Sequence, residues 1–213
     1  MPLCSKLIVI EGLEGAGKST VINALKNHFS LNFETNEYIF TREPGGTPLA
    51  ERIRDIIISS DQNEKLCDES ELLLMYASRM QHVKHLIEPA LLTQKWVISD
   101  RFYLSTFAYQ GGGRSINNEL LHKIHNMLLQ NFKPGLTIYL DIEPKLGLER
   151  IQSRDVIDRI ESEQIDFFQR TRKAYLHNIK QENNYYIIDA SKTAEEVKKE
   201  VVEKVKHYHN SCT

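Results

Sequence analysis

The stretch Gly12-Leu13-Glu14-Gly15-Ala16-Gly17-Lys18-Ser19 fills every fixed position of the pattern GxxxxGK[ST]. An apolar run typical of a buried strand precedes it, and a segment with helical character follows it. The glycines let the backbone bend so that successive N–H groups point at phosphate oxygens, and the start of the helix adds its positive end. We therefore expect a phosphate-binding loop (P-loop, residues 12–19) between a strand and a helix.

The side chains of this loop suit a nucleoside triphosphate. Lys18 can reach the β- and γ-phosphates, and the Ser19 hydroxyl can ligate Mg²⁺. The residues expected to bind ATP are Gly12, Leu13, Glu14, Gly15, Ala16, Gly17, Lys18, Ser19 and Thr20. The loop alone does not identify the acceptor, because ATPases, switches, DNA motors and small-molecule kinases all use it.

Outward from the loop, short apolar runs alternate with longer helical segments. Strands are predicted at residues 6–11, 37–42, 95–100, 136–141 and 185–189, and helices at 18–29, 48–59, 69–92, 117–130 and 162–181. A last helix carries Val197, Val201, Val205 and Tyr208 on one face. This order predicts an α/β P-loop NTPase fold: a five-stranded, mostly parallel sheet with helices on both faces, in a single domain over residues 1–213.

Bulk properties exclude several classes of protein. The net charge of -2 gives no global field for nucleic acid, and the apolar runs are too short to span a membrane. The three cysteines, Cys4, Cys67 and Cys212, form no CxxC pair, so we expect neither a disulfide framework nor a structural zinc site. This use of cysteine fits a reducing compartment, and we expect a cytoplasmic location. The histidine pairs at 82/85 and 122/125 lack a third ligand and are expected to be structural.

Polar residues follow two predicted strands. Asp100 and Arg101 end the third strand, where a carboxylate could hold Mg²⁺ and an arginine could grip a phosphate. Taken alone, the same pair fits a helix-capping Asp beside a surface Arg. Arg42, Glu43 and Pro44 end the second strand in a Pro-Gly-Gly turn that would bring backbone and charge to the same crevice, although it could be only a turn.

Two further clusters lie on helices. Met75 and Arg79 are one helical turn apart, which places an apolar surface beside a cation, as a base and its phosphate would need. Arg150, Arg154, Asp158, Arg159 and Glu161 suggest a short lid at about 150–160 that closes over phosphates. An ordinary amphipathic helix or a solvated charged face would look the same. Gly111-Gly112-Gly113 is expected to be a flexible turn.

Together these segments resemble the thymidylate kinase family of nucleoside monophosphate kinases. The matching stretches are IEGLEGAGKST, TREPGGTPLAE, YASRMQHV, ISDRFYLSTFAYQGGG, LTIYLD and IDRIE, in the family's order from residue 8 to about 161. The resemblance implies transfer of the γ-phosphoryl group of ATP to dTMP, giving dTDP and ADP with Mg²⁺, on a homodimer.

The resemblance also implies roles for single residues. It makes Lys18, Arg101, Glu14 and Arg154 the catalytic set, with Ser19 and Asp100 at the metal. It makes the dTMP site Arg42, Glu43, Pro44, Met75, Arg79, Arg101, Ser105, Thr106, Tyr109 and Gln110. The P-loop contains no arginine, as in bacterial-type members, where the lid supplies that charge through Arg154, with Arg150 in support. Met75 replaces the usual Phe on thymine, which predicts looser base discrimination, and the lid has fewer arginines than is usual.

Competing interpretations are a kinase for another nucleoside monophosphate or a deoxynucleoside, a nucleotide-dependent switch, and a DNA-associated ATPase. The REPGG turn and the DRF block disfavour the first. A switch should show the guanine-reading NKxD element, which is absent from the sequence. A DNA-bound ATPase should show a basic stripe, whereas the net charge is slightly negative.

Overall fold

A five-stranded parallel sheet forms the centre of the molecule. The computed structural model describes residues 5–59, 64, 66–130, 132–151 and 159–212. The strands are β1 (Leu7–Gly12), β2 (Tyr38–Arg42), β3 (Trp96–Asp100), β4 (Leu136–Asp141) and β5 (Tyr185–Asp189). Their order is β2-β3-β1-β4-β5, and every neighbouring pair is parallel. The predicted α/β P-loop architecture is confirmed, with strand ends within one residue of those expected.

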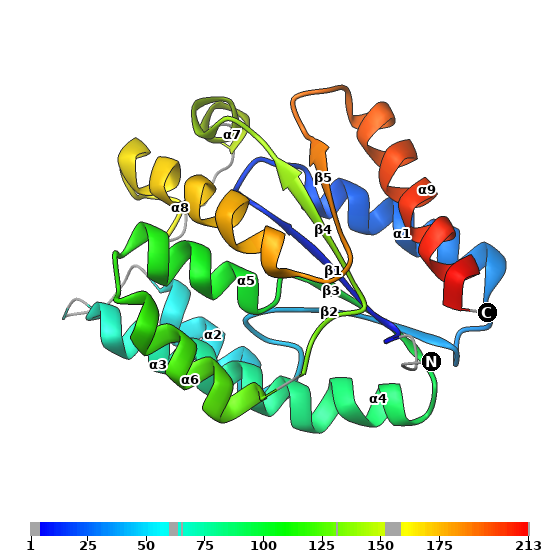
Figure 1. Cartoon of the computed structure of the whole chain (residues 1–213), viewed down its shortest axis with the longest axis horizontal. Helices are drawn as coiled ribbons and strands as arrows, with labels where there is room; N and C mark the ends of the chain where they lie inside the picture. Colours follow the sequence, from blue (N-terminus) through cyan, green and yellow to red (C-terminus); the bar gives the residue numbers. More distant parts are fainter. Residues whose placement is uncertain (1–4, 60–63, 65, 131, 152–158, 213) are drawn as a thin grey trace.

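Helices cover both faces of the sheet. They are α1 (Lys18–Asn32), α2 (Pro48–Ile58), α3 (Asp68–His82), α4 (Glu88–Leu92), α5 (Tyr103–Thr106), α6 (Asn118–Leu129), α7 (Pro144–Ile151), α8 (Ile165–Asn178) and α9 (Ala194–Cys212). The described residues also form two π-helical segments, η1 (Val83–Ile87) and η2 (Phe107–Gly113), and a 3₁₀ turn, η3 (Ile179–Gln181). Helices α1 and α9 lie together on one side of the sheet, and α5 and α8 lie on the other (Figure 1).

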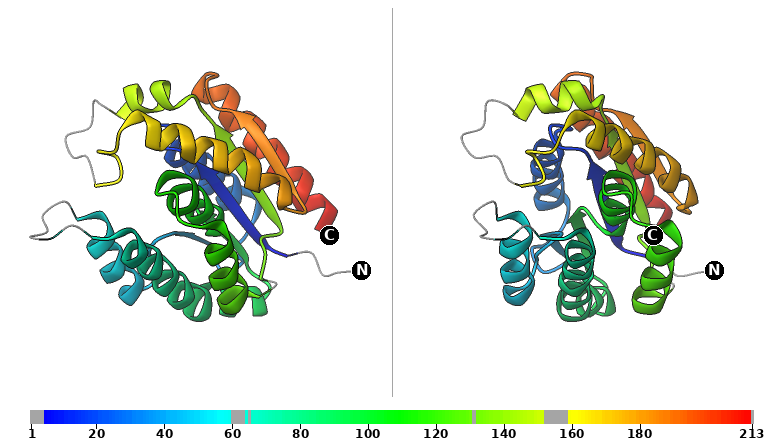
Figure 2. Two further views of the ribbon diagram at one scale, coloured as in Figure 1. Left: turned by 60° about the vertical axis from the view of Figure 1, so that its left-hand side comes forward. Right: turned by 90° about the vertical axis from the view of Figure 1, so that its left-hand side faces the viewer.

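The central strand fixes where the P-loop lies. All six residues of β1 are buried, as expected for a strand with neighbours on both edges and helices on both faces. Because β3 and β4 flank β1 and run parallel to it, the carboxyl ends of the three strands meet at one edge of the sheet. That edge is where open α/β sheets bind ligands. Figure 2 shows the α2–α3 pair and the α7–α8 pair on opposite sides of the molecule.

The single helix predicted at 69–92 is three segments. Helix α3 ends at His82, the π-helical η1 follows, and α4 carries Pro89 in its first turn. Proline has no N–H to donate to the carbonyl four residues earlier and its ring crowds that carbonyl. The wider π-helical turn before Pro89 accommodates the lost hydrogen bond, so that the chain stays helical from α3 to α4.

The prediction of a flexible turn at residues 111–113 is wrong. These glycines end η2, a helical segment packed against α8. A Cβ on Gly112 would lie 2.5 Å from the Cβ of Ala174, and one on Gly113 would lie 2.4 Å from the Phe167 ring. The glycines therefore serve the close approach of two helices rather than the flexibility of a loop.

The two ends of the chain meet. The Tyr208 hydroxyl, on α9, donates a hydrogen bond of 2.8 Å to the backbone oxygen of Ser5. Cys67 is free and exposed, whereas Cys212 is disulfide-bonded, so the expectation that the chain forms no disulfide framework does not hold for Cys212. No helix among the described residues is long and apolar enough to cross a bilayer.

Candidate active site

The P-loop needs its glycines for steric reasons. Gly15 and Gly17 have φ angles of 73° and 86°, in the region that side chains disfavour. A Cβ on Gly15 would lie 2.1 Å from the carbonyl oxygen of Gly147 in α7. The loop therefore passes directly under α7 and opens onto the N-terminus of α1. Within the loop, Gly12, Leu13 and Ala16 are buried.

Lys18 bends back over the loop. Its Nζ donates to the carbonyl oxygens of Gly12, at 3.0 Å, and Leu13, at 2.9 Å. Burial, aided by the neighbouring Arg101 guanidinium, lowers the pKa of Lys18 to about 8. An anion at this position would restore the ammonium form, so phosphate and proton bind here together.

Arg101 is held against the P-loop in one orientation. Its Nη2 donates to Glu14 at 2.6 Å, and its Nη1 donates to the Gly12 oxygen at 2.8 Å. The guanidinium carbon lies 5.0 Å from the centre of the Tyr109 ring. Burial raises the pKa of Glu14, but Arg101 and Lys18 outweigh it, so this pKa is lowered overall. The predicted catalytic residues Glu14, Lys18 and Arg101 thus lie together.

Glu11 anchors this group, and sequence reasoning missed it. Its fully buried carboxylate accepts from the Phe102 N–H at 2.9 Å, the Ser105 hydroxyl at 2.6 Å and the Tyr175 hydroxyl at 2.9 Å. Burial raises its pKa, only partly offset by these donors and by Arg101. Tyr175, from α8, also accepts from Arg101 Nη1 at 3.1 Å. A carboxylate inside an otherwise apolar strand was the available signal for Glu11; Tyr175 gave none.

A second buried network orients Arg79. Its Nε donates to Glu43 at 2.7 Å, and His82 Nδ1 lies 3.0 Å from the other oxygen of the same carboxylate. His82 Nε2 is 2.6 Å from the Thr41 hydroxyl, so both ring nitrogens are used. The prediction that His82 is structural fits this contact set, but its tie to the predicted residue Glu43 was not foreseen.

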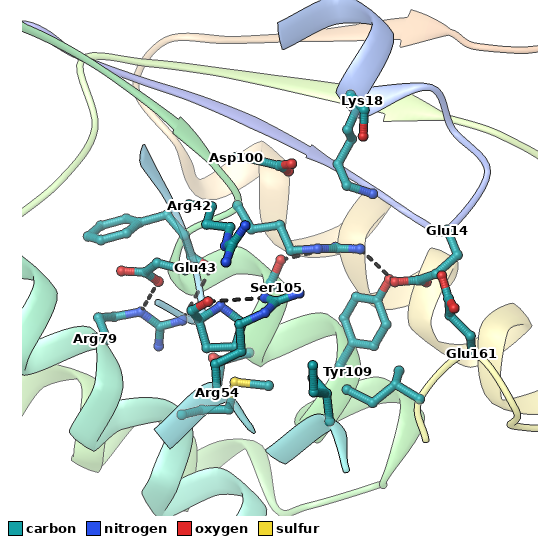
Figure 3. A pocket seen from close by; sticks show the side chains of 18 of the residues that line it. Glu14, Lys18, Arg42, Glu43, Arg54, Arg79, Asp100, Ser105, Tyr109 and Glu161 are labelled. Atoms are coloured by element: carbon teal, nitrogen blue, oxygen red, sulfur yellow. Dashed lines mark hydrogen bonds and ion pairs between the residues drawn. The ribbon is translucent and has the colours of Figure 1, made fainter. Parts of the chain in front are cut away.

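These residues enclose one cavity of about 280 Å³ (Figure 3). The predicted residues that line it are Glu14, Gly15, Gly17, Lys18, Ser19, Thr20, Arg42, Glu43, Pro44, Met75, Arg79, Asp100, Arg101, Ser105, Thr106, Tyr109 and Gln110. Arg54, Ile58 and Phe102 also line it and were not predicted as ligand contacts, and Ile160 and Glu161, from the region of the expected lid, line it as well. Lys18 and Asp100 extend into it from one side and Arg79 from another, with Arg42 between them.

Four buried polar atoms on the wall of this cavity have no hydrogen-bond partner within the described residues. They are Arg79 Nη1, Asp100 Oδ1, Thr106 Oγ1 and Gln110 Oε1. Such atoms are rare in folded proteins because each one loses its hydration without compensation. Their gathering here indicates a polar ligand that supplies both donors and acceptors.

The donor set also fits a divalent cation bound with phosphates. Asp100 offers a carboxylate oxygen and Ser19 a hydroxyl, which are hard ligands of the kind Mg²⁺ takes alongside water and phosphate oxygens. Among the described residues, no group of three or more His, Cys, Asp or Glu side chains could hold a metal by itself.

The arginines of the expected lid fall into three situations. Arg154 lies outside the described residues. Arg150 donates to the Ala190 oxygen at 2.9 Å and to the Gly15 oxygen at 3.4 Å, so it lies beside the P-loop. Arg159 instead donates to the Ile57 oxygen at 3.0 Å and to Glu71 at 2.6 Å.

Comparison with known proteins agrees with this site. The family model described as thymidylate kinase matches residues 10–201. The thymidylate kinase of Shewanella sp. (strain MR-4) is 51% identical over 198 residues, covering 93% of this chain and 94% of the relative. That of Legionella pneumophila (strain Paris) is 47% identical over 210 residues, 98% of each chain. The crystal structure of thymidylate kinase from Ehrlichia chaffeensis superposes with a TM-score of 0.77 at 28% identity, covering 95% of this chain and 98% of that one. The family model spans most of the chain, and these relatives share about half of its residues. The chain therefore belongs to the thymidylate kinase family.

Proposed function

We propose that this enzyme transfers the γ-phosphoryl group of ATP to dTMP, giving dTDP and ADP, and so supplies dTDP for dTTP synthesis. The observation that carries the proposal is a single cavity whose wall joins a P-loop to a second set of cations and unpaired polar atoms. Two nucleotides entering from opposite sides would meet there by their phosphates.

The P-loop side receives ATP in this proposal. Backbone N–H groups of the loop and the N-terminus of α1 would bind the phosphates, and Lys18 would hold the β- and γ-phosphates. Ser19 and Asp100 would hold Mg²⁺, which neutralises charge on the phosphates when bound. The lid arginine, Arg154 with Arg150 in support, would complete the charge around the transferred group.

The opposite side receives dTMP. Arg42 and Arg101 would bind its phosphate, Met75 would pack on the thymine face, and Arg79 would donate to a base oxygen. Ser105, Thr106, Tyr109 and Gln110 would enclose the sugar and base, and Glu14 would keep Arg101 in register between the two nucleotides. No protein nucleophile is required, because the attacking atom is a phosphate oxygen of dTMP. Catalysis is then alignment plus stabilisation of charge.

A coupled assay of ADP release tests the proposal. ATP and Mg²⁺ are supplied with dTMP, dUMP, dCMP, dGMP or thymidine as acceptor. We expect dTMP to give the highest kcat/KM and thymidine, which lacks the acceptor phosphate, to give no turnover. A preference for another monophosphate would make the chain a kinase of that nucleotide, and turnover without any acceptor would make it an ATPase.

We further propose that residues 1–213 act as one kinase domain, that the enzyme is a cytoplasmic homodimer, and that it binds neither nucleic acid nor membranes. Support for the dimer comes from large apolar side chains exposed on α3 and α6, with Leu73 exposed by 59% and Met127 by 70%. Such side chains commonly mark a protein interface when they gather. Light scattering coupled to size exclusion should give twice the mass of 24.7 kDa.

A further inference from the structure

Glu71 is a buried carboxylate that does not line the cavity but contacts a residue that does. It lies in the first turn of α3 and is fully buried. Its Oε1 accepts from Gln110 Nε2 at 2.7 Å. Its Oε2 accepts from Arg159 Nη2 at 2.6 Å and from Arg114 Nη2 at 3.2 Å. The carboxylate therefore joins the cavity wall to two arginines outside it.

Gln110 presents its amide in one orientation because of this contact. The side chain is 1% exposed, lines the cavity, and has two ends of nearly equal shape: an NH₂ that donates and an oxygen that accepts. An ionised carboxylate only accepts, so the NH₂ must face Glu71. The amide oxygen then faces away from Glu71, and it has no hydrogen-bond partner among the described residues.

The two arginines keep Glu71 in the accepting form. Burial raises the pKa of this carboxyl, but the Gln110 hydrogen bond and the charges of Arg114 and Arg159 outweigh burial, so the pKa is lowered. A neutral carboxyl could donate and would tolerate the reversed amide. The ionised form does not, because two acceptor oxygens would then face each other.

We infer that Glu71 is a positioning residue that sets base selection, by holding the Gln110 carbonyl oxygen toward the ligand. This inference rests on the proposed function. The fixed oxygen accepts from a ring N–H and disfavours a ring nitrogen lone pair. Arg79 Nη1, also unpartnered on the wall of the cavity, is a donor. An acceptor and a donor together match N3–H and O4 of thymine, whereas cytosine carries a lone pair at N3 and an NH₂ at position 4.

The test compares dTMP with 5-methyl-dCMP, which keeps the 5-methyl group and differs only in this donor and acceptor pattern. In Glu71→Gln the new amide can donate or accept, so the side-chain amide of Gln110 is free to flip. Glu71→Asp keeps the charge for both arginines but no longer reaches Gln110. We expect the ratio of kcat/KM for dTMP to that for 5-methyl-dCMP to fall about tenfold in both variants, since a misplaced buried polar partner weakens discrimination of this kind. Arg79 still favours thymine, so the ratio stays above one.

Glu163→Gln is the matched control, because Glu163 also pairs with Arg114 in the same network but shows no contact with Gln110 within the described residues. Its ratio should equal that of the unmodified enzyme. The inference would be contradicted if folded Glu71→Asp phosphorylated both acceptors more slowly but kept the kcat/KM ratio of dTMP to 5-methyl-dCMP within twofold of the unmodified enzyme. Glu71 would then have only a structural role. If Glu71→Gln does not fold, Glu71→Asp decides. A failure of the unmodified enzyme to phosphorylate dTMP would instead overturn the proposed function.

Discussion

Arg101 is fixed before any substrate arrives. Its backbone adopts a φ of 70°, and its guanidinium is held by Glu14, the Gly12 oxygen and Tyr175. A group already oriented toward developing charge costs no reorganisation during the reaction. At the scale of single residues, preorganisation of this arginine is the main physical feature of the site.

Removing either principal cation should therefore slow phosphoryl transfer. We expect Lys18→Ala and Arg101→Ala each to lower kcat by about 10²-fold or more, the usual effect of removing one stabilising group from a reaction centre. Steady-state assays at saturating ATP and dTMP measure this. Near-native turnover in a folded variant would remove that residue from its proposed role.

Lys18 should take up a proton when ATP binds. With its pKa lowered to about 8, the ammonium is largely deprotonated above that pH, and phosphates at the P-loop raise the pKa again. At about pH 8.5 ATP itself is fully ionised. Titration calorimetry in buffers of different ionisation enthalpy should show net proton uptake that rises with pH from about 7 to 9. The variant Lys18→Met should lose it, and equal uptake in both proteins would contradict the assignment.

At the scale of elements, the sheet was predictable and several helices were not. Buried parallel strands are continuous apolar runs, and β4 matched the expected residues in full. The edge strand β5 is mostly exposed, but its apolar and aromatic run also matched the expected residues. The break before Pro89 and the packing of Gly112 and Gly113 depend on neighbours in space, which a local pattern does not contain. Helices α5 and α7 were not predicted, because four and eight residues are too few to show a helical repeat of apolar positions.

The site, too, could be predicted from the sequence for some residues and not for others. Several residues recognised from motifs, such as Lys18, Arg42 and Asp100, lie at the P-loop or at strand ends, where the fold itself places them on the cavity. The residues that orient them do so through contacts between distant parts of the chain: Tyr175 accepts from Arg101, and His82 contacts Glu43. Their roles depend on contacts across the fold, so no spacing rule could have identified them.

Helix α1 should depend on one aromatic anchor. Phe29 is 1% exposed and its ring packs against Phe33 and Trp96, whereas Leu31 on the same helix is 83% exposed. We expect Phe29→Ala to lower the free energy of unfolding by about 3–5 kcal/mol, because a cavity adds to the lost transfer energy. Leu31→Ala should change it by less than about 0.5 kcal/mol. Urea unfolding measures both, and equal effects would contradict this packing.

At the scale of the whole molecule, the fold gathers two sets of cations at one edge of a parallel sheet. The P-loop leaves the central strand β1; Asp100 and Arg101 come from the end of the neighbouring β3, and Arg42 from the end of β2, the next strand along. The α2–α3 pair closes the cavity from one side and the P-loop from the other. This convergence, rather than any single residue, is what suits the molecule to bring two anionic nucleotides together.

A crystal structure with a bisubstrate analogue, adenosine and thymidine joined through five phosphates, tests that convergence most directly. The account predicts one molecule per chain, with its phosphates running from Lys18 past Asp100 and Arg101 to Arg42, and its thymine against Met75 and Arg79. A complex in which thymidine lies outside this cavity, or in which Lys18 and Arg42 contact different molecules, would contradict it.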